Sequence, residues 1–226
     1  MSLRKKINDM TEIKPKAVFS AVKNSIIKLE KDKAVASFPD FPGETIPAIV
    51  IEDLPVVPLF IMGKGKNRAE QLALFLLSEN KNADREFALM LAAYYIAEAD
   101  MEGINHDIAF AQMCLETGFL RYGGLVVPEM NNFCGLGSIG QNQKGEWFLT
   151  VELGVRAHIQ HLKAYASEEP LKGELVDPRY RFVRRGSSPI LRGLSGTWAA
   201  DIYYADKIET ILFRLSRFTG EEKPIP

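Results

Sequence analysis

The sequence contains only two cysteines, Cys114 and Cys134, among its 226 residues. Neither has the spacing of a metal-binding pair, and His106, His158 and His161 form no zinc motif with a nearby cysteine or carboxylate pair. We therefore expect two buried thiols rather than a disulfide. We also expect no metal ion and no other cofactor.

The chain also lacks an excess of charge, since 28 basic residues face 29 acidic ones and the formal net charge is −1. This balance gives no indication of binding to nucleic acid or to an anionic membrane surface. No apolar run approaches the ~18 residues of a membrane span, and the opening M-S-L-R-K-K-I-N-D-M has no apolar signal-peptide segment. Length and composition suit one soluble globular domain with an additional segment.

The N-terminal part differs from the rest of the chain. Apolar residues at helical spacing, among them Val18 and Val22, predict an amphipathic helix over residues 14–33. Five prolines then follow between residues 39 and 58 and exclude a long helix, while I-V-I at 49–51 suggests an edge strand. We expect residues 1–65 to form an extension packed on a body of residues 66–226, with the helix against residues 66–101.

The body is predicted to be mostly helical. We expect Asn80 or Asn82 to cap the helix that runs to about residue 101, and Thr150 to cap the helix over residues 151–167. A short strand is considered at 145–148, in the Gly-rich region that separates the third and fourth helices. The expected helices cover residues 68–78, about 83–101, 102–119, 151–167, and about 198 or 201 to 218.

The third of these helices ends in a carboxylate, Glu116. Asn105 can cap its start, Gly118 can end it in a left-handed turn, and apolar residues surround most of its surface. We expect Glu116 to be mostly buried, and both burial and the negative end of the helix dipole would raise its pKa towards the range of a general acid near neutral pH. The alternative is a solvated glutamate or one paired with Arg121.

Three blocks of sequence carry a family resemblance. They are A-Q-M-C-L-E-T-G at 111–118, N-N-F-C-G-L-G at 131–137 and W-A-A-D-I-Y-Y-A-D-K-I at 198–208. In this order they resemble the glucosaminidase family of bacterial cell-wall lytic enzymes, glycoside hydrolase family 73, over residues 84–216. The resemblance implies a mainly α (α+β) fold, in which residues 66–226 form a lysozyme-like helical body with a small irregular β lobe. It also implies that Glu116 is the general acid and Tyr204 the site tyrosine.

Five further residues of these blocks are candidates for substrate binding. The glutamine lies one turn before Glu116 and can bond the carboxyl or the sugar. The asparagines can fix a turn or donate to an acetamido group. The aromatic residues can stack on a sugar or fill the core. They are Gln112, Asn131, Asn132, Phe133 and Trp198.

A glycosidase usually needs a second carboxylate, as base or nucleophile. Glu146 in G-E-W-F is the nearest candidate, although an exposed structural glutamate would give the same pattern. Glu152 fits a helix start better. The acetamido oxygen of the substrate could also attack the anomeric carbon, and the sequence leaves these alternatives open.

The expected function is that of an exported endo-β-N-acetylglucosaminidase. It would cut the β-1,4 bond between N-acetylglucosamine and N-acetylmuramic acid in peptidoglycan glycan strands, as a monomer outside the cytoplasm. Two alternatives remain, a non-catalytic wall-binding or adhesin module on the same fold, and a lytic transglycosylase.

Overall fold

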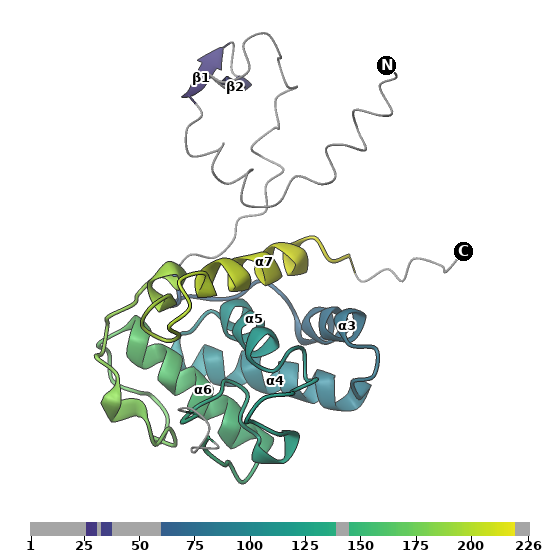
Figure 1. Ribbon diagram of the computed structural model, residues 1–226, viewed down its shortest axis with the longest axis vertical. Helices are drawn as coiled ribbons and strands as arrows, with labels where there is room; N and C mark the ends of the chain where they lie inside the picture. The colour runs from purple at the N-terminus through teal and green to yellow at the C-terminus, as the bar shows by residue number, and fades with distance from the viewer. Residues whose placement is uncertain (1–25, 31–32, 38–59, 139–144, 220–226) are drawn as a thin grey trace. The chain divides into compact units, whose positions relative to one another are not determined.

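The computed structural model describes residues 26–30, 33–37, 60–138 and 145–219, and the chain divides into two compact units, 1–55 and 56–226 (Figure 1). In the first unit, strand β1 (Ile26–Glu30) pairs antiparallel with β2 (Lys33–Ser37), with Lys28 opposite Val35. The predicted helix over 14–33 is therefore wrong for the residues that form β1 and for the start of β2. Consecutive β-branched residues in I-I-K-L-E favour a strand there.

Two other expectations for this part of the chain concern regions that the structure does not describe. Residues 14–25 and the strand considered at 49–51 lie outside the described residues. The packing of residues 1–65 on the body stays a prediction.

The second unit is mainly helical, as predicted. Among its described residues the bridges that lie outside strands are single pairs, and residues 145–148 form no strand. The amides of Glu146 and Phe148 instead donate to the carbonyls of Leu136 and Met130 at 2.8 and 3.0 Å. The helices are α3 (Ala69–Glu79), α4 (Arg85–Glu102), α5 (His106–Glu116), α6 (Val151–Ala166) and α7 (Tyr204–Ser216), with 3-10 turns η3 (Pro128–Met130), η4 (Tyr180–Phe182) and η5 (Leu191–Leu194).

Capping residues explain where α4, α5 and α6 begin. Asn105 caps α5 and Thr150 caps α6, as predicted. The expected cap of α4 was wrong: Asp84 accepts from the amide of Phe87, while Asn80 donates to the carbonyl of Phe119 at 2.8 Å. A carboxylate one residue before the helix caps it directly, whereas Asn80 lies too far back.

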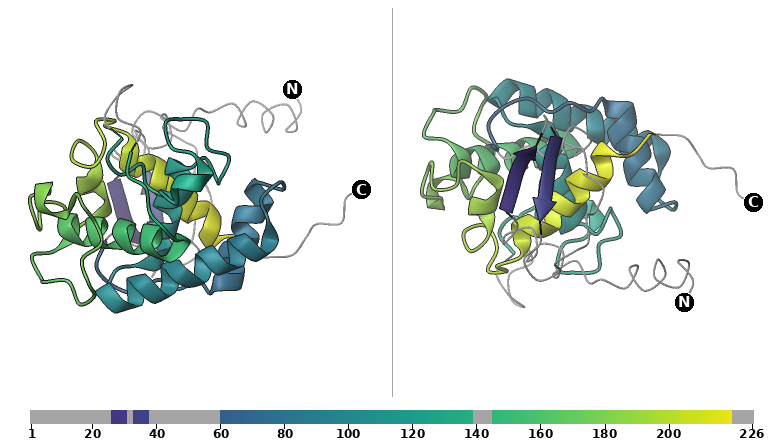
Figure 2. Two further views of the ribbon diagram at one scale, coloured as in Figure 1. Left: turned by 90° about the horizontal axis from the view of Figure 1, so that it is seen from below. Right: turned by 90° about the horizontal axis from the view of Figure 1, so that it is seen from above.

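Helix α5 forms the centre of the unit. Every residue from His106 to Cys114 is buried, and α5 contacts α4, α6 and α7. Figure 1 shows it between α7 and the pair α4 and α6, and Figure 2 shows α3 and the loop-rich segment 167–203 on opposite sides of this body. Burying large side chains such as Phe110 stabilises the fold by about 1.5–3 kcal/mol each. This packing leaves the C-terminal end of α5 at the surface.

Both cysteine thiols are buried and free, as expected. Within the described ranges, no helix is long and apolar enough to cross a membrane. The same ranges hold no group of three or more histidine, cysteine or carboxylate side chains arranged to hold a metal ion.

A buried ion pair connects α4 to α6. Nζ of Lys163 lies 2.8 Å from Oε2 of Glu102, and their side chains are 0% and 1% exposed. The amides of Lys172 and Gly173 also donate to this carboxylate. Burial alone would raise the pKa of Glu102, but these hydrogen bonds outweigh it and hold the pKa below its ordinary value. The pair therefore fixes the end of α4 against α6 and the loop after it.

Gly154 in α6 lies against the loop that follows η3. A Cβ at this position would come within 1.8 Å of the carbonyl oxygen of Asn131 and 3.3 Å of the Phe133 ring. The absence of a side chain therefore permits the close approach of α6 to this loop.

Candidate active site

Glu116 ends α5 and is exposed to solvent, contrary to the expectation that it is mostly buried. The chain turns away directly after it, since Gly118 has a φ of +57°. Its carboxyl nevertheless faces Tyr204, as expected. Oε1 accepts hydrogen bonds from the hydroxyl of Tyr204 and from Nε1 of Trp198, the latter at 3.1 Å. Arg121 donates instead to backbone carbonyls, so the alternative of an ion pair between Arg121 and Glu116 is not seen.

The surroundings of Glu116 influence its protonation in opposite directions. Desolvation by the protein around the carboxyl raises the pKa of Glu116, while hydrogen bonds from Tyr204 and Trp198 lower it. Desolvation outweighs the hydrogen bonds, so the pKa stays above its ordinary value. A larger fraction of this carboxyl is therefore protonated near neutral pH than of an ordinary glutamate, as general-acid chemistry requires.

Tyr204 is the first residue of α7 and is buried. Its hydroxyl accepts from Nε2 of Gln112 at 2.9 Å and donates to Glu116. Burial and the neighbouring Glu116 raise the pKa of Tyr204 well above its ordinary value. The phenol therefore keeps its proton at neutral pH and acts as a donor.

Behind Gln112 the hydrogen bonds continue through two residues that the sequence analysis did not select. Oε1 of Gln112 lies 3.0 Å from Nε2 of His158, and Nδ1 of His158 lies 2.8 Å from the hydroxyl of Tyr95. Gln112, His158 and Tyr95 are all fully buried. The sequence signal that could have found them is a polar side chain on the apolar face of a predicted helix.

Two adjoining pockets open beside these residues, and both are lined by Gly135 and Ser138. Trp198 connects them further, because it lines one pocket and donates to Glu116, which lines the other. We call them the glutamate pocket, lined by Glu116, Thr117, Gly118, Tyr122, Gly124, Leu125, Val126, Gly135 and Ser138, and the aromatic pocket, lined by Cys134, Gly135, Leu136, Gly137, Ser138, His161, Tyr165, Arg179, Phe182, Val183 and Trp198.

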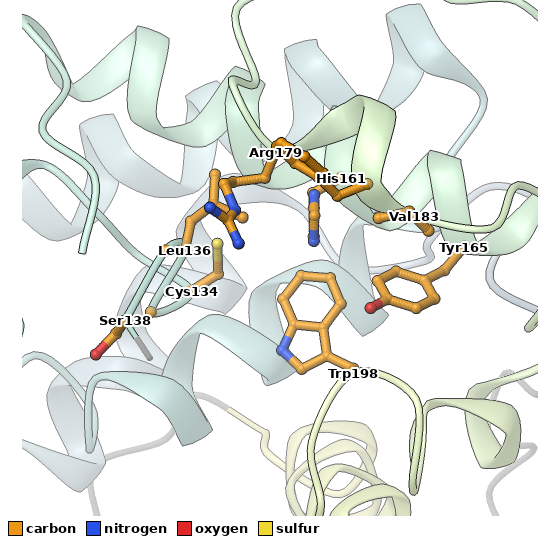
Figure 3. A pocket seen from close by; sticks show the side chains of 11 residues that line it. Cys134, Leu136, Ser138, His161, Tyr165, Arg179, Val183 and Trp198 are labelled. Atoms are coloured by element: carbon orange, nitrogen blue, oxygen red, sulfur yellow. The ribbon is translucent and has the colours of Figure 1, made fainter. Parts of the chain in front are cut away.

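The aromatic pocket is built around Trp198. The ring centre of Trp198 lies 5.1 Å from that of His161 and 5.4 Å from that of Tyr165, and Figure 3 shows the indole facing both rings. His161 is held by Asp177, whose fully buried Oδ2 lies 2.8 Å from its Nδ1. Arg179 lies over the Phe182 ring at 4.9 Å. Among the described residues that line it, the pocket therefore combines aromatic side chains with the cationic side chain of Arg179.

Comparison with known proteins decides the family. A family model described as mannosyl-glycoprotein endo-beta-N-acetylglucosaminidase matches residues 92–217. An uncharacterized protein of Borreliella burgdorferi is 42% identical over 164 residues, which are 73% of this chain and 80% of that protein. This chain belongs to the glucosaminidase family. It is thereby a member of a family of glycoside hydrolases, and its mainly α fold agrees with the lysozyme-like superfamily.

The other candidate residues of this glucosaminidase-family chain hold the loop that lines both pockets. Asn132 is fully buried and donates to the carbonyls of Leu136 and Glu146 at 2.9 and 3.1 Å. Phe133 is fully buried in the core. Asn131 donates to the carbonyl of Phe148 at 3.0 Å. These contacts hold the segment that carries Gly135 and Ser138.

Glu146 lies beside the pockets without lining either of them. Its side chain lies against Gly137, where a Cβ would come within 2.9 Å of its Cγ and Oε1. The structure therefore brings together Glu116, Tyr204, Gln112 and Trp198, while Glu146 lies against Gly137 of the loop that lines the aromatic pocket. Glu152 pairs with Arg156 at 2.7 Å on the surface of α6.

Proposed function

We propose that this protein is a peptidoglycan hydrolase that cleaves the β-1,4 bond between N-acetylglucosamine and N-acetylmuramic acid, with Glu116 as general acid. The observation that carries the proposal is the position of Glu116. It is the one carboxylate among the described residues that line the two pockets, and two hydrogen-bond donors orient it. A carboxyl with a raised pKa, reachable from solvent, is suited to protonate a leaving glycosidic oxygen.

Tyr204 supports this chemistry from the protein side. As the leaving oxygen departs, positive charge develops on the sugar ring and Glu116 becomes ionised. The Tyr204 hydroxyl donates to Glu116 and so stabilises the carboxylate that forms.

The aromatic pocket provides a site for a neighbouring sugar of the glycan. Trp198 lines this pocket with its ring, and a flat aromatic surface suits the apolar face of a pyranose ring. Arg179 would lie near the acidic groups of a muramyl residue and its peptide. The two adjoining pockets would thus hold an extended strand across the Gly135–Ser138 segment.

The second catalytic group is proposed to come from the substrate. Glu146 lines neither pocket in the described part of the chain, which supports a nucleophile other than this side chain. The 2-acetamido oxygen of N-acetylglucosamine can attack the anomeric carbon and replace a protein nucleophile. This mechanism needs only one protein carboxyl, the one that Glu116 supplies.

The substrate also determines where the protein must act. Peptidoglycan lies outside the cytoplasmic membrane, so we propose that the protein is exported, and that it acts as a monomer along glycan strands.

Mass spectrometry of digested peptidoglycan tests the proposed function. Reducing N-acetylglucosamine ends are expected, and they should disappear with Glu116→Gln. Anhydro-muramyl ends would instead identify a lytic transglycosylase, and binding without products would identify a wall-binding module.

A further inference from the structure

One continuous series of hydrogen bonds crosses four helices. Its five members are Tyr95, His158, Gln112, Tyr204 and Glu116. Tyr95 comes from α4, Gln112 and Glu116 from α5, His158 from α6 and Tyr204 from α7. The four contacts run Tyr95–His158, His158–Gln112, Gln112–Tyr204 and Tyr204–Glu116. Every member except Glu116 is buried. The polar hydrogens that join the four buried members are therefore satisfied by neighbours in the series.

The protons of the series can be assigned one by one. Burial, and to a lesser degree the nearby His161, lower the pKa of His158 to about 3, so the ring is neutral and carries one N–H. Gln112 donates its amide to Tyr204, so its carbonyl faces His158 and requires that proton on Nε2. Nδ1 of His158 must then accept from the hydroxyl of Tyr95.

All four hydrogen bonds consequently point the same way, towards Glu116. Oε1 of Glu116 accepts from Tyr204 at the end of the series and also from Trp198. An oxygen that already accepts two hydrogen bonds is a poor place for the acid proton. The proton of neutral Glu116 therefore belongs on Oε2, which lies 3.6 Å from the position of a Cβ at Gly135, a residue lining both pockets.

We propose that Tyr95 and His158 are positioning residues that, through Gln112 and Tyr204, keep Oε1 of Glu116 an acceptor and so direct the acid proton to Oε2, where the two pockets meet. This inference rests on the proposed role of Glu116 as general acid. It assigns a function to two side chains of the helical core that do not touch the substrate.

Among the residues that the structure describes, few charged and titratable groups surround the series. Trp198 faces both Glu116 and the His158 ring, and the thiol of Cys134 lies close enough to influence Glu116, Tyr204 and Tyr95. The titratable side chains that face Glu116 are Tyr204 of α7, Tyr122 of the following loop and Cys134, and those that face His158 are Tyr95 of α4 and His161 of α6.

Tyr95→Phe removes the first donor of the series, the Tyr95 hydroxyl, with little change of shape. His158 is then free to take the other tautomer, the amide of Gln112 can reverse, and the Tyr204 hydroxyl is no longer fixed towards Glu116. Loss of the hydrogen bond from Tyr204 to the Glu116 carboxylate raises the pKa of Glu116. In a plot of kcat against pH, we therefore expect the alkaline limb to move to higher pH by about half a pH unit or more. We expect kcat to fall by about tenfold, with KM nearly unchanged.

Two variants of His158 give a graded test. His158→Gln keeps an amide donor near the position of Nε2, whereas His158→Leu removes both nitrogens. We expect His158→Gln to retain more kcat than His158→Leu. The matched control is Phe110→Leu, since Phe110 packs edge-on against Tyr95 at 5.7 Å and forms no part of the series. It should lower the unfolding temperature without moving the pH limb.

A carbon-13 NMR titration of the Glu116 carboxyl provides a readout that does not depend on activity. The expected result is a higher Glu116 pKa in Tyr95→Phe and His158→Leu than in the wild type and in Phe110→Leu. Equal pKa values and equal pH limbs in the folded variants would overturn the inference. Failure of the proposed function would look different, because the wild type would then release no glycan products or Glu116→Gln would keep its activity.

Discussion

Nε1 of Trp198 lies 3.1 Å from Oε1 of Glu116, the same oxygen that accepts the hydroxyl proton of Tyr204. Trp198 reaches this position from a loop, because α7 begins only at Tyr204. One indole thus contacts the proposed acid with its N–H and lines the aromatic pocket with its ring. Orientation of the acid and shape of the sugar site depend on the same side chain.

Glu116→Gln should abolish turnover while the fold persists. The amide has nearly the same shape but cannot deliver a proton, so we expect a loss of about 10²–10⁴-fold in kcat. The release of reducing ends from peptidoglycan measures the rate, and thermal unfolding checks the fold. Glycan binding should stay close to that of the wild type. A variant with wild-type turnover would remove Glu116 from the mechanism.

Trp198→Phe should change the pH dependence of the reaction. The indole hydrogen bond lowers the pKa of Glu116, so its loss raises that pKa. Because the acid works in its protonated form, the rate falls as pH rises through this pKa. The alkaline limb of kcat should therefore move to higher pH.

The control for this variant is Tyr165→Phe. It also alters the aromatic pocket, but the Tyr165 hydroxyl donates to the carbonyl of Thr197 and not to Glu116. The alkaline limb should stay in place in Tyr165→Phe. A similar displacement in both variants would indicate a general disturbance of the pocket.

Glu146→Gln should reduce turnover only by a few-fold. The carboxylate lies against Gly137 and lines neither pocket in the described residues, so its charge is not expected to take part directly. Steady-state rates of Glu146→Gln and Glu116→Gln on the same glycan provide the comparison. A loss as large as that of Glu116→Gln would give Glu146 a chemical role, reached by movement of its loop.

Glu102→Gln should destabilise the fold strongly at neutral pH. It leaves the Lys163 ammonium buried without its carboxylate, which costs about 3–5 kcal/mol of unfolding free energy. Urea unfolding at several pH values measures the cost. The double variant Glu102→Gln/Lys163→Met removes both charges and should recover much of the stability.

The sign of the pH effect follows from the lowered pKa of Glu102. Such a carboxylate stabilises the fold fully above its unfolded pKa of about 4.3, and this contribution is lost as pH falls through the folded pKa. The difference in stability between the wild type and Glu102→Gln should therefore shrink in acid. A constant difference down to the acid transition would contradict this account.

The sequence predicts α5 well because its signals are local. Asn105 caps it, apolar residues cover it, and the blocks at its end and at the start of α7 place Glu116 and Tyr204 in one site. The hairpin of β1 and β2 was missed, because an apolar spacing that suits a helix also appears in short strands whose residues are β-branched. The cap of α4 was expected at Asn80 or Asn82 but is Asp84, because several polar residues in this short segment are suitable caps.

The roles of His158 and Tyr95 could not be read from the sequence. A buried histidine on α6 and a buried tyrosine on α4 become partners only when the faces of α4, α5 and α6 meet. The exposure of Glu116 was also beyond local reasoning. It depends on the path of the chain after Gly118, which the residues of α5 do not determine.

The close approach of Gly154 to the carbonyl of Asn131 restricts the movement of one side of the two pockets. The backbone of α6 at Gly154 packs directly against the backbone of the loop at Asn131. A displacement of this loop, which continues to Ser138, would disturb that packing. The other side, residues 118–127, contains three glycines and four exposed loop positions after Tyr122. We therefore expect residues 118–127 to adjust to a bound glycan more readily than the loop packed against α6.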